Sequence, residues 1–148
     1  MIGKTLAIAL TVGAGALVAL QAPVNSRLGK TVGTFQAASV SFAVGLAVLV
    51  IIALVAGGGV GELGRLGQVP ARYLTGGLLG AAYVACVLVT VRSLGAGGVT
   101  AVTITGQLTM AVVIDQLGLL GVAQRSITPA RVAGLALLGA GVFLIVRR

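Results

Sequence analysis

The segment LQAPVNSRLGK places two amide side chains at the end of a long apolar stretch. Gln21 and Asn25 are one helical turn apart and would share a helix face, with Pro23 between them. A proline inside a helix removes one backbone hydrogen bond and frees a carbonyl oxygen. Because polar groups are costly in lipid and by default indicate function, we expect both amides to face the interior of a helix bundle.

A second segment, VTAVTITGQLTMAVVIDQLG, places Thr103, Gln107 and Asp115 on one helical stripe with a four-residue period. Asp115 is the only carboxylate in an apolar stretch, because Glu62 lies in a glycine-rich connection. A carboxylate in this position could bind a proton and couple its movement to that of a solute. Gln107 could contact a solute, or its side chain could form a hydrogen bond to a neighbouring helix, and the sequence does not distinguish these roles.

Asp115 also has a structural interpretation. It could be exposed at the membrane interface, or it could form an ion pair with a cation from another helix end. The candidate partners for such a pair are Arg27, Arg92 and Arg125.

The elements that position these groups are expected to be membrane helices. Only 8% of the 148 residues are charged and 58% are hydrophobic, whereas soluble domains carry roughly 25% charged residues. Several uncharged stretches reach the ~20 residues that a transmembrane helix needs. We therefore expect an all-α integral membrane protein, a single transmembrane domain over residues 1–148. Its helices would cover approximately residues 5–25, 34–56, 71–91, 99–120 and 129–146.

Local signals support these boundaries. Thr128 followed by Pro129 is typical of an N-cap and the first helical position, and the glycines from Gly95 to Gly98 predict a turn. Small residues at helical spacing favour close helix packing in lipid. The residues that we expect at such contacts are Ala37, Ser41, Gly45, Gly76, Gly80 and Gly134.

Composition argues against several classes of function. The chain has no histidine and one cysteine, and it shows no paired carboxylates and no nucleophile–base pair. We therefore expect no enzyme activity, no cofactor and no metal site. The net charge of +8 would suggest nucleic acid in a soluble protein. Here the cations lie at the ends of the expected helices, where they anchor the chain at the interfaces, and we expect no nucleic-acid partner.

The distribution of Lys and Arg does not predict which way the chain is oriented in the membrane. Cytoplasmic loops normally carry the excess of Lys and Arg, but five expected helices place five cations on each side of the membrane. The chain could therefore insert both ways and pair as an antiparallel homodimer, which would create an inverted-repeat architecture. The two sides would not carry equal numbers of cations if the number of helices were wrong by one. A weak orientation bias set by other features of the chain would also remove the case for insertion both ways.

Several motifs resemble the YdcZ-type family of short bacterial membrane proteins in the drug/metabolite transporter superfamily. The matching residues are Gln21, Asn25, Leu28 and Gly29; then Gly106, Gln107, Leu108, Asp115 and Gly118; then the segment RSITPARVAGLALLGAGVFLIVRR. Gln116 and Leu117 stand where His-Phe is common in the family, so a proton relay through that histidine gains no support. The resemblance implies a multi-pass protein of the bacterial inner membrane, related to transporters with two inverted halves.

These observations together predict a secondary transporter or exporter of a small solute, which works as a dual-topology homodimer. Protons are the candidate coupling ion. The expected pathway residues, contributed by both copies, are Gln21, Asn25, Tyr83, Thr103 and Gln107. Arg27 and Asp115 would be gating or coupling charges near opposite ends. Few aromatic residues argue against a large flat cation as the solute, and Arg27 favours an anionic or neutral polar one. The alternatives are a channel-like pore for a small ion and a membrane assembly protein that transports nothing.

Overall fold

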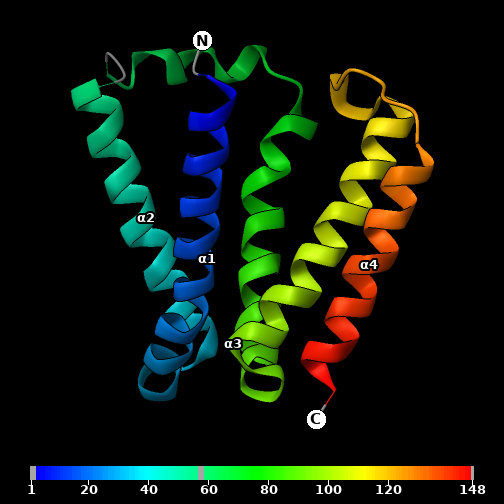
Figure 1. The fold of residues 1–148 in the computed structure, drawn as a ribbon. Coiled ribbons are helices and arrows are strands. Elements are labelled where there is room, and N and C mark those ends of the chain that lie inside the picture. The colour runs from blue at the N-terminus through cyan, green and yellow to red at the C-terminus, as the bar shows by residue number, and fades with distance from the viewer. Residues whose placement is uncertain (1–2, 57–58, 148) are drawn as a thin grey trace. The chain divides into compact units, whose positions relative to one another are not determined.

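The computed structural model describes residues 3–56 and 59–147, and every regular element in these two ranges is helical. The long helices are α1 (Lys4–Val32), α2 (Thr34–Ala56), α3 (Gly76–Leu117) and α4 (Pro129–Val146) (Figure 1). Short 3-10 helices connect them: η1 (Gly61–Gln68), η2 (Ala71–Thr75) and η3 (Leu119–Gly121). All four long helices are long and apolar enough to cross a membrane. The all-α membrane class predicted from composition is confirmed.

Helix α3 is too long for one crossing of the bilayer. Its 42 residues would extend about 60 Å at ~1.5 Å per residue, which is twice the ~30 Å hydrocarbon thickness. Gly95 interrupts the helical geometry with φ 70° and ψ 168°, a backbone conformation that glycine adopts without steric cost. The interruption divides α3 into a first segment, residues 76–94, and a second segment, residues 96–117. The turn predicted for Gly95–Gly98 is thus confined to its first glycine.

The chain separates into two compact units, Met1–Arg92 and Ser93–Arg148, and the boundary lies inside α3. Unit 1 therefore contains α1, α2 and most of the first segment of α3. Unit 2 contains the second segment of α3 and α4. The single domain expected from the sequence stays a prediction.

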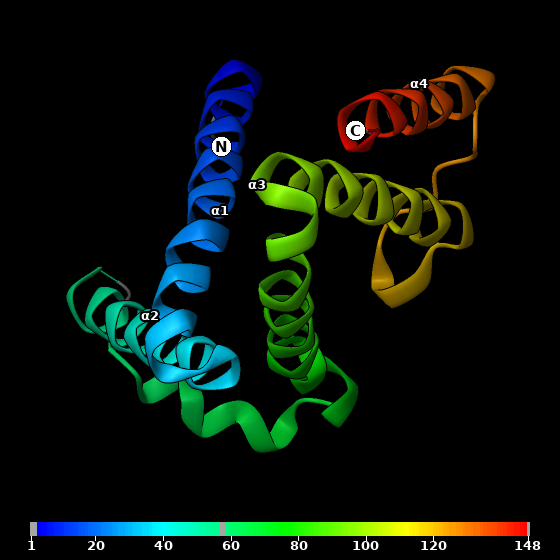
Figure 2. The same ribbon diagram turned by 90° about the horizontal axis from the view of Figure 1, so that it is seen from below.

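In unit 1, α1 and α2 form a helical hairpin with a one-residue connection. Gly33 ends α1 with φ 98°, and its N–H donates to the Gly29 carbonyl at 3.1 Å. The two helices lie close together at this end and diverge toward their other ends (Figures 1 and 2). Helix α1 thus runs about two turns past Asn25. Arg27 and Lys30 are therefore helical residues, and no loop begins in this segment.

The buried side chains of unit 1 gather on one face of each helix. On the first segment of α3 they are Val84, Val87, Leu88 and Val91, which share a face because their spacing is that of an amphipathic helix. On α1 the buried residues are Ala22, Asn25 and Gly29, again one face. Many other large apolar side chains of the long helices are exposed, as expected where lipid or a second copy covers the helix.

In unit 2, the second segment of α3 and α4 run antiparallel. Asp115 near the end of the segment contacts Arg131 near the start of α4. At the other end, a Cβ built at Gly98 would lie 3.7 Å from Val146 Cγ2. The predicted start of α4 is confirmed, because Thr128 Oγ1 accepts a hydrogen bond from Arg131 N at 3.3 Å and Pro129 is the first helical residue.

Candidate functional site

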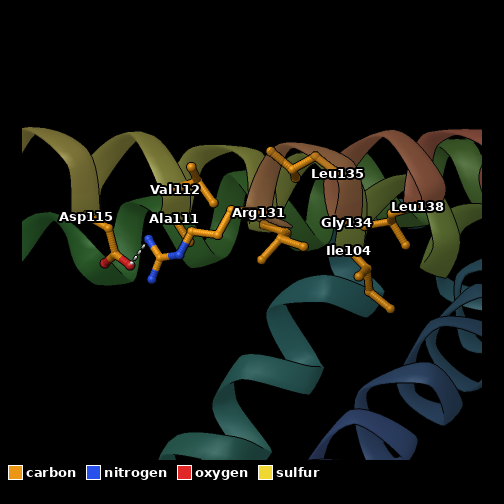
Figure 3. Close-up of a pocket in the computed structure, with 9 residues that line it drawn as sticks. Ile104, Ala111, Val112, Asp115, Arg131, Gly134, Leu135 and Leu138 are labelled. Atoms are coloured by element: carbon orange, nitrogen blue, oxygen red, sulfur yellow. Dashed lines mark ion pairs between the residues drawn. The ribbon is translucent and has the colours of Figure 1, made fainter. Parts of the chain in front are cut away.

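The second segment of α3 and α4 are linked by an ion pair between Asp115 and Arg131. Arg131 Nη1 lies 3.3 Å from Asp115 Oδ2, and the side chains are 30% and 29% exposed, respectively. Figure 3 shows the two side chains directed toward each other from their separate helices. Asp115 is therefore ion-paired in the structure, and its role in coupling stays a prediction. Its partner is not one of the three arginines that we expected.

Arg131 is brought to Asp115 by the connection between α3 and α4, which folds back onto the end of α3. Helix α3 ends at Leu117, and Gly118 follows it in a left-handed conformation with φ 61°. The backbone N–H of Arg125 then donates to the Asp115 carbonyl oxygen at 2.8 Å. The Thr128 cap starts α4 directly afterwards. Arg131 therefore falls in the first turn of α4, opposite the last turn of α3.

Gln116 anchors the same connection at two points. Its side-chain Oε1 accepts a hydrogen bond from the backbone N–H of Ile127 at 2.6 Å. Its backbone carbonyl accepts a hydrogen bond from Gln124 Nε2 at 2.8 Å. Gln116 is one of the two residues at which this sequence differs from the motif that it resembles. Its amide oxygen supplies the acceptor that fixes the backbone just before the start of α4.

The ion pair lies at one end of a pocket of about 420 Å³ in unit 2. This volume falls within the ~300–1,000 Å³ typical of small-molecule sites. Away from the ion pair the walls are mostly apolar, and Figure 3 shows Ile104 and Leu138 at the opposite end from Asp115. Gly134 also lines the pocket, and a Cβ built on it would meet no atom within 4 Å. The pocket therefore combines an apolar interior with one charged end.

The guanidinium of Arg131 has hydrogen-bonding capacity to spare. Its Nη1 is buried, and it makes no hydrogen bond with any residue in the described ranges, although it lies within ion-pair distance of Asp115. A guanidinium carries five N–H donors in a planar fork that matches a carboxylate. The ion pair with Asp115 therefore leaves the hydrogen-bonding capacity of Arg131 Nη1 unused.

A second polar cluster lies in the α1–α2 hairpin of unit 1. Asn25 Nδ2 donates to Ser41 Oγ at 3.0 Å, and Gln21 Nε2 donates to the same oxygen at 3.4 Å. The prediction that the two amides share a helix face is confirmed. Asn25 is only 6% exposed, whereas Gln21 is exposed and borders a pocket of about 320 Å³. We call Gln21, Asn25 and Ser41 the amide cluster.

The other expected pathway and gating residues lie apart from these hydrogen bonds and from the ion pair. Tyr83 is half-buried on the first segment of α3, and Arg27 is exposed on α1. On the second segment of α3, Thr103 is half-buried and Gln107 is exposed. Neither of the latter two lines the pocket at Asp115. Their role in a pathway stays a prediction.

The residues expected at helix contacts have different surroundings. Ala37 is fully buried, and a Cβ built at Gly29 would lie 3.6 Å from its Cβ. A Cβ built at Gly80 would lie 3.6 Å from the Phe42 ring. In contrast, a Cβ built at Gly45, Gly76 or Gly134 would meet nothing within 4 Å. These three glycines leave open notches on the helices.

The sequence interpretation missed Arg131 and the apolar walls of the pocket. One signal could have identified Arg131. Asp115 falls just before the end of one expected helix and Arg131 just after the start of the next, with a short connection between them. Antiparallel neighbours bring such residues to the same level. No comparable signal singles out Ile104 or Leu138, because many leucines and isoleucines in this chain have the same local pattern.

Potential metal ligands are not gathered anywhere in residues 3–56 and 59–147. No group of three or more His, Cys, Asp or Glu side chains that could hold a metal ion occurs there. The charged pocket and the amide cluster are two polar arrangements among the described helices.

Comparison with known proteins finds a family for this chain. A family model described as "Putative inner membrane exporter, YdcZ" matches residues 6–144. Searches of curated proteins and of solved structures give no match. The matched range includes both the amide cluster and the Asp115–Arg131 pair.

Proposed function

The chain belongs to the YdcZ family, and from this premise we propose that it exports a small solute across the bacterial inner membrane. The observation that carries the proposal is the Asp115–Arg131 ion pair at the charged end of the pocket in unit 2. Ionisable side chains among membrane helices are rare and are typical of solute or ion pathways. When an ion pair lies beside an open apolar pocket, a solute can displace one residue of the pair and bind to the other.

The proposed functional unit is an antiparallel homodimer. Five expected helices with five cations on each side allow both orientations in the membrane, and two opposed copies form the inverted repeat found in many secondary transporters. Exposed apolar side chains along the long helices and the open notches at Gly45 and Gly76 give a second copy surfaces to pack against. Rocking of one copy against the other would open the pathway to each side in turn.

In this proposal the polar residues have distinct tasks. The pathway is lined by Gln21, Tyr83, Thr103 and Gln107 from both copies, and Asn25, which was also expected to line it, lies beside it in a fixed contact with Ser41. Arg27 acts as a gating charge, and Asp115 changes its partner as the solute enters and leaves. This exchange of partner is the proposed step that would couple solute movement to a proton gradient.

The test is solute flux in proteoliposomes. Purified protein is reconstituted with a panel of small solutes of different charge, and flux is measured with and without a pH gradient. Asp115→Asn should abolish the dependence on the gradient. Glu62→Gln is the matched control, because Glu62 pairs with Arg65 at 2.6 Å on an exposed 3-10 helix and both side chains are more than 70% exposed.

Other results would decide against the proposal. Full gradient dependence in Asp115→Asn would remove Asp115 from the coupling step. Large passive currents that need no gradient would instead favour an ion pore. If no solute moves and no current flows, while Gln21, Asn25 and Gln107 accept apolar substitutions at the cost of stability alone, the chain is an assembly protein. The dimer is tested separately, by C-terminal reporters that are active on one side of the membrane only.

A further inference from the structure

We propose that the pocket in unit 2 binds a zwitterionic solute with a compact apolar body. The anionic group of the solute lies at Arg131, its cationic group lies at Asp115, and its body lies against Ile104, Leu108 and Leu138. This inference rests on the proposed function and specifies the class of solute.

The charge balance of the pocket favours a solute without net charge. The pocket contains one carboxylate and one guanidinium, so it is electrically neutral when the two are paired. A solute with a single charge would leave one unpaired charge among apolar helices, where an unpaired charge is costly. A zwitterion contributes one charge of each sign and keeps the balance at zero. It can also take the place of the internal pair without leaving either residue unpaired.

The ion pair is not held by a close hydrogen bond, which favours this exchange. The distance of 3.3 Å between Arg131 Nη1 and Asp115 Oδ2 is longer than the ~2.7–2.9 Å of a charge-assisted hydrogen bond. Nη1 is buried without a hydrogen-bond partner among the described residues. A carboxylate from the solute could receive two parallel N–H bonds from the guanidinium. An ammonium group could then occupy the place that the guanidinium leaves at Asp115.

The apolar walls and the volume of the pocket limit the polarity and the size of the uncharged part of the solute. Ile104, Leu108 and Leu138 are apolar and can offer a polar body no hydrogen bonds. Gly134 keeps this region open, because a side chain there would project into free space. A volume of about 420 Å³ has room for a branched aliphatic group with its two charged substituents. The amide cluster of unit 1 contains no charged group, so it cannot distinguish a zwitterionic solute from a singly charged one by pairing charges.

The experiment compares three probes with a common branched skeleton. L-leucine carries both charges, 4-methylpentanoate carries only the carboxylate, and 3-methylbutylamine carries only the ammonium. Equilibrium binding to the purified full-length protein in nanodiscs is measured by competition, with empty nanodiscs to correct for partition into lipid. The wild-type protein should bind L-leucine at least about tenfold more tightly than either analogue, because each analogue leaves one charge unpaired.

Charge variants should reverse this order in opposite directions. Asp115→Asn should make 4-methylpentanoate the preferred probe, and Arg131→Gln should make 3-methylbutylamine the preferred probe. Gly134→Leu should weaken all three without changing their order, because it fills the pocket and leaves both charges in place. Gly139→Leu is the matched control: it lies on the same helix, outside the pocket lining, and its Cβ would also meet nothing within 4 Å.

Two results would overturn the inference. One is a wild-type preference for either singly charged probe. The other is an equal effect of Asp115→Asn and Arg131→Gln on all three probes. If either charge variant fails to fold, Gly134→Leu with its control still tests the location of the site.

Binding and flux separate this inference from the proposed function. If proteoliposomes move another solute while none of the three probes binds, the solute class is wrong and the exporter proposal stands. If the probes bind in the expected order and no solute moves, the exporter proposal fails.

Discussion

The amide cluster in unit 1 and the ion pair in unit 2 both place polar side chains among apolar helices, but they differ in charge, burial and available space. In the amide cluster, the deeply buried Asn25 donates a short hydrogen bond to Ser41 across a tight hairpin. In unit 2, Asp115 and Arg131 are almost one-third exposed and meet at 3.3 Å beside a pocket. The first arrangement suits a fixed contact, and the second suits a contact that opens.

The amide contact and the ion pair are expected to differ in how easily each of them breaks. A neutral amide that finds an acceptor in the partner helix has little reason to leave it, because separation in lipid would leave a buried polar group unsatisfied. A charged pair with spare donors can exchange its partner if another ion arrives. We therefore expect variants in unit 2 to change solute selection, and variants of Asn25 and Ser41 to change mainly stability.

The largest effect is expected when a charge in unit 2 is reversed. Asp115→Arg places two guanidinium groups opposite each other, and the affinity for L-leucine should fall by about 100-fold, because facing like charges cost several kcal/mol. The double variant Asp115→Arg with Arg131→Asp restores one charge of each sign. Its affinity should return to within about tenfold of the wild type. If the double variant binds no better than the single one, the pair does not act as an exchangeable unit.

The next effect concerns the stability of the α1–α2 hairpin. Ser41→Ala removes the oxygen that accepts from both Gln21 and Asn25, and it should lower the free energy of unfolding by about 1 kcal/mol. Ser39→Ala is the matched control on the same helix, because its hydroxyl donates to the Phe35 carbonyl within α2. Unfolding in mixed detergent, followed by circular dichroism, measures both. Equal losses in the two variants would show that the hydroxyl of Ser41 has no special role.

Much of the fold could be predicted from the sequence because membrane helices must satisfy their own backbone hydrogen bonds. Long uncharged stretches located the helices, and Thr128 with Pro129 located the start of α4. The end of α1 was placed too early, at residue 25, because Arg27 and Lys30 were expected to lie at the membrane interface beyond the helix. In the structure the helix continues until Gly33 supplies the positive φ that ends it.

The site was predictable only in part. The common face of Gln21 and Asn25 followed from their spacing, since a helix fixes which residues lie one turn apart. The partner of Asp115 did not follow, because it depends on how the connection folds back. That fold is determined by hydrogen bonds from Arg125 and Gln124 to the backbone of α3, and neither residue type indicates such a bond in advance. The pocket walls depend on which apolar side chains face α4, and spacing alone does not distinguish them.

A smaller effect is expected at the connection that positions Arg131. Gln116→Ala removes the acceptor of the Ile127 N–H, which should cost about 1 kcal/mol and raise hydrogen exchange near Ile127 about fivefold. Gln116→Glu retains a side-chain oxygen and should keep the protection. Hydrogen–deuterium exchange with mass spectrometry of peptides from this connection measures the change. Unchanged exchange in Gln116→Ala would mean that the remaining hydrogen bonds fix the connection without this side chain.

The smallest effect on stability, and the sharpest test of the comparison, is expected at Gln21. Its bond to Ser41 is long at 3.4 Å and its side chain is exposed beside a pocket. Gln21→Ala should therefore cost no more than the ~0.6 kcal/mol that is average for hydrogen bonds between membrane helices. If Gln21 lines the pathway, solute flux in proteoliposomes should nevertheless fall about threefold or more, because a polar contact of ~0.6 kcal/mol or more is lost along the route.

Thr11→Val is the matched control for Gln21→Ala, because the Thr11 hydroxyl is also exposed on α1 and donates to the Ala7 carbonyl of its own helix. The control should change neither stability nor flux. A clear loss of stability in Gln21→Ala with normal flux would assign Gln21 to the fixed contact, together with Asn25. The amide cluster would then be structural throughout, and the charged pocket would remain as the place where unit 2 meets the solute.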